Sequence, residues 1–111
     1  MSPATAAIHT PLKPSVFHIL LALSQGQLHG LAIADSVEEE TGGQIRLGPG
    51  TLYRSLKEMA EANLVRQVQV GDEDPRRKIY EMSTAGRTLL HAEAERLARV
   101  VEVARSRKVL S

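Results

Sequence analysis

The chain has 111 residues, of which 42% are hydrophobic, and this length is typical of a single domain with one core. It carries 14 lysine and arginine residues against 13 acidic ones, so its net charge of +1 excludes a uniformly cationic protein that binds nucleic acid by bulk charge. It contains no cysteine, which excludes disulfide frameworks, cysteine-ligated metals and thiol nucleophiles and favours a cytoplasmic location.

Two segments open the chain. Residues 1–13 have no hydrophobic period and contain two prolines, which predicts a flexible N-terminal arm. A helix is expected from Pro14 to about Ser24, where apolar residues on nearly every side indicate burial. This apolar run is too short to span a bilayer and is not followed by a signal-peptide cleavage pattern, so we expect no membrane contact.

A second helix is expected from about Gly30 to Thr41, and Gly42 and Gly43 supply the left-handed backbone that ends a helix. Acidic residues cover its expected outer face. Its inner face is expected to carry Leu31, Ile33, Ala34 and Val37.

The third helix has the clearest start, because Pro49 suits a first helical position and Gly48 can precede it as the cap. Helical spacing predicts an inner stripe of Leu52, Leu56, Met59, Ala60 and Leu64. The opposite face then presents Gly50, Thr51, Tyr53, Arg54 and Lys57, all within the first turns.

After Leu64 the hydrophobic period becomes two, which predicts a β-hairpin whose long charged tip is the segment GDEDPRR. A final helix is expected from Ser83 or Thr84 to about Lys108. Its apolar residues recur at four-three spacing and exceed what one small domain covers, so they predict packing against a second copy of the chain. The predicted dimer interface consists of Leu90, Ala94, Leu97, Val101 and Ala104.

This order of elements predicts a mainly α fold with a small β-hairpin, namely a winged helix-turn-helix followed by a C-terminal dimerisation helix. The expected organisation is an N-terminal arm over 1–13, a DNA-binding domain over 14–83 and the dimerisation helix over 84–111.

The third helix has what a reader of the DNA major groove needs: free amides at its start, small residues and cations in the first turns. Arg54 can donate two hydrogen bonds to guanine, and Lys57 can meet a phosphate or a base. Alternatively, both cations pair with Glu58 and Glu61 on a solvated face. The predicted wing contacts are Arg76, Arg77 and Lys78, although these could equally neutralise the three preceding acidic residues.

The sequence offers no catalytic constellation. The four histidines lack metal-binding spacing, the segment Gly48–Thr51 lacks the lysine of a phosphate-binding loop, and no nucleophile is paired with a base. We therefore expect no enzyme activity, metal or cofactor.

Three segments resemble the PadR family of winged-helix transcriptional regulators: LALSQGQLHG, LGPGTLYRSLKEM and RRKIYEMSTAG, in the order and spacing of the family signatures. There are three departures. Leu31 replaces a tyrosine that can contact the DNA backbone, Gly48 replaces a serine cap, and Ile79 replaces an aromatic residue of the wing.

The resemblance implies a homodimeric regulator, in many relatives a repressor, that binds an inverted repeat in operator DNA. It implies DNA contacts by Thr51, Tyr53, Arg54 and Lys57 of the third helix and by Arg76, Arg77 and Lys78 of the wing. Because many relatives release DNA when a small molecule binds near the dimer interface, it also implies an effector of unspecified identity. The alternative function is a winged-helix module that binds protein rather than DNA, through its acidic second helix and its last helix.

Overall fold

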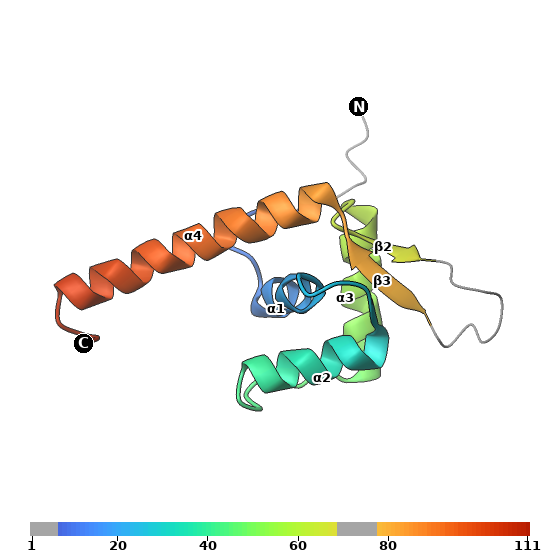
Figure 1. Ribbon diagram of the computed structural model, residues 1–111, viewed down its shortest axis with the longest axis horizontal. Helices are drawn as coiled ribbons and strands as arrows, with labels where there is room; N and C mark the ends of the chain where they lie inside the picture. The colour runs from blue at the N-terminus through green and yellow to red at the C-terminus, as the bar shows by residue number, and fades with distance from the viewer. Residues whose placement is uncertain (1–6, 69–77) are drawn as a thin grey trace.

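The computed structural model describes residues 7–68 and 78–111. Its elements in chain order are α1 (Pro14–Leu23), β1 (Leu28–His29), α2 (Gly30–Glu40), α3 (Pro49–Glu61), β2 (Val65–Val68), β3 (Ile79–Met82) and α4 (Thr84–Ser106). Figure 1 shows α1, α2 and α3 grouped beside the sheet, while α4 leaves the sheet as a long arm. This arrangement confirms the predicted fold class, a mainly helical winged helix followed by a long C-terminal helix. None of the helices within the described ranges has the length and apolar character needed to cross a membrane.

The helix boundaries follow from local chemistry. Pro14 and Pro49 each stand at the start of a helix, where a missing backbone donor is not needed. Gly42 and Gly43 have φ angles of 61° and 84° directly after α2, as the predicted helix stop requires. At the start of α4, the Ser83 hydroxyl accepts a hydrogen bond from the Gly86 amide at 2.9 Å.

The sheet has three antiparallel strands in the order β1-β3-β2. In the pairing of β2 with β3, Val65 lies opposite Met82 and Val68 opposite Ile79, which confirms a hairpin at this place in the chain. The strand β1 was not predicted, because two residues are too few to show a hydrophobic period. The expected hairpin tip lies in residues 69–77, outside the described residues.

The core lies where α1, α2, α3, β2 and β3 meet. Its fully enclosed side chains are those of Ile19, Leu20, Ile33, Val37 and Met59. Leu31 was predicted to face inward but is 73% exposed. The prediction was wrong because Leu31 and Ile33 lie about 200° apart around the helix and cannot share one face. Ala60, which was expected to extend the inner stripe of α3, is also exposed.

The segment before α1 differs from its prediction as well. We expected a flexible arm over residues 1–13, but within the described part, residues 7–13, Leu12 is only 8% exposed and belongs to the core. Its backbone amide donates a hydrogen bond to the Glu93 carboxylate of α4 at 2.9 Å. A single buried leucine produces no periodic pattern, so this contact could not be predicted from the sequence.

Candidate nucleic-acid interface

Helix α3 has two distinct faces. Leu52, Leu56 and Met59 are buried against the core. The opposite face is exposed, as predicted, and consists of Gly50, Thr51, Arg54 and Lys57 with Tyr53 at its edge. Because the apolar stripe fixes the rotation of the helix, the two cations are held toward solvent.

The cations of α3 stand apart from the acidic residues of the same helix. Within the ranges 7–68 and 78–111, no salt bridge joins Arg54 or Lys57 to a carboxylate, including Glu58 and Glu61 one turn away. The alternative of a self-neutralised helix surface is therefore not what this structure shows. Within the described ranges, both cations are left without a carboxylate partner.

Tyr53 connects the start of α3 to the start of α2. A methyl group built at Gly30 would overlap the Tyr53 hydroxyl and lie 2.9 Å from the ring carbon that carries it. Only a residue without a side chain therefore permits this packing. Burial raises the pKa of the nearby Tyr80 hydroxyl above its ordinary value, and the charge that Tyr53 would carry adds to the rise. Tyr53 is 37% exposed, so part of its ring remains open to solvent.

The turn from α2 to α3 is long, but it is ordered by hydrogen bonds. The Thr41 hydroxyl accepts a hydrogen bond from the Ile45 amide at 3.0 Å and donates one to the Val37 carbonyl at 3.0 Å. Ile45 and Leu47 then pack against the core. The turn thus determines where α3 begins relative to α2.

The wing is fixed at its base. The Glu81 carboxylate of β3 accepts hydrogen bonds from Arg66 of β2 and from Gln27, the latter at 2.8 Å. Lys78 is exposed at the start of β3. The two other predicted wing contacts, Arg76 and Arg77, lie outside the described residues.

The acidic residues of α2 are partly neutralised. Glu40 accepts a hydrogen bond from Ser36 at 3.1 Å and lies 3.0 Å from the His18 ring, while Glu38 lies 3.8 Å from Arg46. In the two described stretches of chain, no group of three or more acidic or histidine side chains could hold a metal ion.

The predicted dimer residues of α4 divide into two groups. Leu90 is 8% exposed and packs into the core of its own chain, so little of its surface is left for a subunit interface. It belongs to the half of α4 that lies on α1, whereas the more distal half extends beyond the domain. The other four residues keep at least part of their surface open: Ala94, Leu97, Val101 and Ala104.

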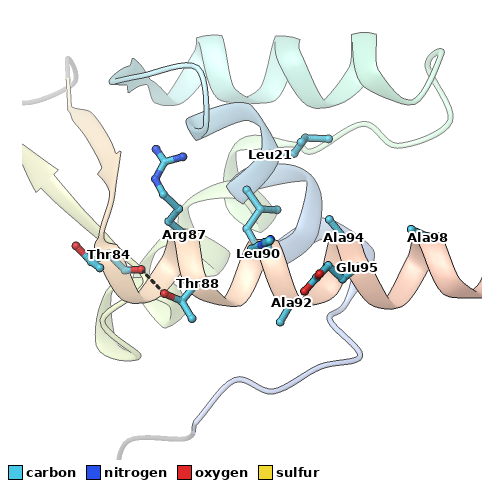
Figure 2. A pocket seen from close by; sticks show the side chains of 10 residues that line it. Leu21, Thr84, Arg87, Thr88, Leu90, Ala92, Ala94, Glu95 and Ala98 are labelled. Carbon is cyan, nitrogen blue, oxygen red and sulfur yellow. Dashed lines mark hydrogen bonds between the residues drawn. The ribbon is translucent and has the colours of Figure 1, made fainter.

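An open groove of about 960 Å³ lies along α4 beside α1. Figure 2 shows Leu90, Ala94 and Ala98 pointing to the side of the helix on which Leu21 of α1 lies, with Arg87 nearer the sheet. Further along α4, the exposed apolar side chains are those of Val100, Val101 and Val103. An apolar strip therefore runs from this groove along the helix.

Comparison with known proteins agrees with this geometry. Residues 19–92 match the transcriptional regulator PadR-like family. The chain belongs to this family. The family is described as one of transcriptional regulators.

A curated relative of this chain is much longer than the chain itself. The chain is 40% identical over 82 residues to a 37.1 kDa protein in a Streptomyces fradiae transposon, a match that covers 74% of this chain and 22% of that protein. The chain thus spans about a fifth of the length of this curated relative.

Solved structures share the PadR fold. A PadR family transcription regulator from Clostridium difficile superposes with a TM-score of 0.73 at 23% identity, covering 85% of this chain and 97% of that one. PadR of Bacillus subtilis in complex with operator DNA gives a TM-score of 0.62 at 22% identity, covering 72% and 46%. These TM-scores show that the chain shares the fold of both proteins.

Proposed function

We propose that this PadR-like protein binds operator DNA through the exposed face of α3 and through its wing. The observation that carries the proposal is that Arg54 and Lys57 project to solvent without an acidic partner on their own helix. The first turn of α3 adds free backbone amides, and Gly50 and Thr51 allow close approach to the DNA. The solved complex of the Bacillus subtilis relative with its operator supports this assignment.

The exposed groups have distinct roles in this proposal. Arg54 donates two hydrogen bonds to a guanine edge in the major groove, and Lys57 contacts a phosphate or a base. Thr51 and Tyr53 lie beside them and position the helix on the backbone. Wing contacts to the flanking phosphates come from Arg76, Arg77 and Lys78.

A salt titration tests DNA binding. Fragments selected from random duplex DNA are titrated with protein at several salt concentrations, and the logarithm of affinity should fall linearly with the logarithm of salt, with a slope near −0.9 per phosphate neutralised. Because the net charge is only +1, we expect a shallow slope and weak binding to unrelated DNA. If no fragment is retained while a protein partner co-purifies, the chain is instead a protein-binding winged helix.

We further propose that the protein is a homodimer held together by α4 and that it represses transcription from an inverted repeat. The support is the apolar surface that one copy of the domain leaves open on α4: Val100, Val101 and Val103 are exposed, and Leu97 and Ala104 are partly exposed. Replacement of Leu97 by glutamate should yield monomers in sedimentation, because it places a charge in this surface. A Leu97→Glu chain that stays dimeric would contradict the proposed dimer interface on α4.

The groove beside α1 is a suitable place for a small-molecule effector. It is predominantly apolar, and Arg87, His91 and Glu95 provide polar groups along it. A bound effector should raise the melting temperature by mass action and lower operator affinity. A compound that raises the melting temperature without changing operator affinity binds the protein but is not an effector.

A further inference from the structure

Helix α4 is attached to the winged helix along a single line. The buried residues of α4 are Gly86, Leu90 and Glu93, spaced four and three apart and hence on one face. The described helix has no buried residue after Glu93, although it continues to Ser106. Glu93 is therefore the last residue of α4 that the domain buries.

Glu93 is an unusual anchor, because it is the one charged residue buried within the described parts of the chain, with 2% of its surface exposed. Its carboxylate accepts hydrogen bonds from Arg96 Nε at 2.7 Å and Arg96 Nη2 at 2.9 Å. It also accepts the Leu12 amide at 2.9 Å. The Arg96 hydrogen bonds hold the pKa of Glu93 below its ordinary value, so the carboxylate stays charged at neutral pH.

The contact with Leu12 fixes α4 to α1. Leu12 is itself buried, and only Lys13 separates it from Pro14, the first residue of α1. The Leu12 amide is held in place by the buried backbone next to α1. Rotation of α4 relative to α1 would break its hydrogen bond to Glu93, so this bond resists the rotation. Arg96, one turn further along, holds the carboxylate in place from its outer side.

The part of α4 after Glu93 converts a small change of angle into a large displacement of its end. Residues 94–106 extend about 20 Å beyond Glu93 at the helical rise per residue. A tilt of about 10° at Glu93 moves the end of the helix by about 3.5 Å, close to the 3.4 Å between successive base pairs. Because both copies of a symmetric dimer tilt, a change of this size at each anchor alters the separation of the two DNA half-sites by about one to two base-pair steps.

We propose that Glu93 is a positioning residue that sets the angle between α4 and the winged helix and thereby selects the half-site spacing of the operator. The inference rests on the proposed homodimer on an inverted repeat. Glu93 does not touch DNA in this proposal; it acts through Leu12 and Arg96.

The test is a series of DNA duplexes. Starting from an inverted repeat selected with the wild-type protein, the spacer between half-sites is shortened or lengthened one base pair at a time. Wild-type protein should favour one spacing by about tenfold or more, and Glu93→Ala should reduce this preference to about threefold or less while remaining dimeric. Glu93→Gln keeps an acceptor for the Leu12 amide but loses the charge that pairs with Arg96, and should give an intermediate preference. Glu102→Gln, the same change at an exposed residue of α4 outside the groove, should behave as wild type.

A second measurement does not need DNA. Because the chain has no cysteine, Glu61→Cys and Arg107→Cys can carry two spin labels on α3 and at the end of α4. In dimers formed with excess unlabelled chain, the distribution of distances between the labels should be narrow in wild type and broad in Glu93→Ala. Arg96→Ala keeps the contact with Leu12 and should broaden the distance distribution less. This variant replaces Glu93→Ala in the test if Glu93→Ala does not fold.

The outcomes separate the two proposals. Equal spacing preference and equally narrow distances in wild type and in the Glu93 and Arg96 variants would refute the role of Glu93 while leaving DNA binding intact. A wild-type protein that binds no duplex at any spacing would refute the proposed function and, with it, the selection of spacing.

Discussion

Replacement of Gly86 by alanine should destabilise the protein, because Gly86 is where α4 first meets the domain. A methyl group there would overlap the Leu64 carbonyl oxygen and lie 3.0 Å from Met82 Cγ. Carbon atoms at such contacts prefer separations of about 3.5–4.0 Å, so the new group cannot be accommodated without movement. The Leu64 oxygen is also not free to move, since it accepts the Ser83 amide at 3.0 Å.

Two opposing effects determine the size of this change. Alanine favours a helix over glycine by about 1 kcal/mol. Overpacking in a well-packed site costs about 1–3 kcal/mol, and displacement of a hydrogen-bonded backbone carbonyl places Gly86→Ala toward the upper end or beyond. We expect a net loss of about 1–2 kcal/mol, or about 4–16 °C in melting temperature for a domain of this size.

The assay is thermal unfolding followed by circular dichroism at equal protein concentrations, because dimer stability depends on concentration. Gly50→Ala is the matched control: it also lies in a helix, but a methyl group there meets no atom within 4 Å. It should unfold at or above the wild-type temperature. If Gly86→Ala is as stable as Gly50→Ala, α4 does not begin against the Leu64 carbonyl as described here.

Three further predictions concern the site. Gly30→Ala should push the Tyr53 ring outward and lower operator affinity with little change in melting temperature; unchanged affinity would show that the ring position is unimportant. Arg54→Ala should weaken operator binding by about 1–3 kcal/mol and relax specificity at one base, whereas equal loss on all sequences would indicate a phosphate contact. The Arg66 hydrogen bond lowers the pKa of Glu81 in the folded protein. The ionised Glu81 side chain therefore stabilises the fold above the unfolded-state pKa of about 4.3, and this stabilisation is lost as the pH falls through the folded-state pKa. Glu81→Gln should therefore flatten the acid limb of the unfolding free energy; an unchanged limb would contradict this.

The sequence predicted the long elements because their signals are local and repeated. Pro49 with the Leu52 and Leu56 stripe defines α3 within its own residues, and the chain after Leu64 shows the period of a strand. In contrast, β1 exists only because Leu28 and His29 pair with Tyr80 and Ile79, far away in the chain. No local pattern encodes such a pairing.

The site was predictable to the extent that it depends on one helix. Arg54 and Lys57 face outward because the apolar stripe lies opposite them, and spacing alone shows this. The packing of Tyr53 on Gly30 and the hydrogen bond from Leu12 to Glu93 join residues of different elements. Each needs the folded arrangement before it can be recognised.

Helix α4 shows why one hydrophobic pattern can hide two functions. Its four-three spacing runs without a break from Leu90 through Ala94 and Leu97 to Ala104, which led us to assign all of it to a subunit interface. The structure divides this stripe at Glu93: Leu90 before it packs on its own domain, and no residue of α4 after it is buried. A charged residue inside an apolar stripe, followed at the third position by Arg96, was the signal available in the sequence. Because α4 both joins the domain and carries the proposed dimer surface, its two halves should respond differently to mutation, with loss of folding in the first and loss of dimers in the second.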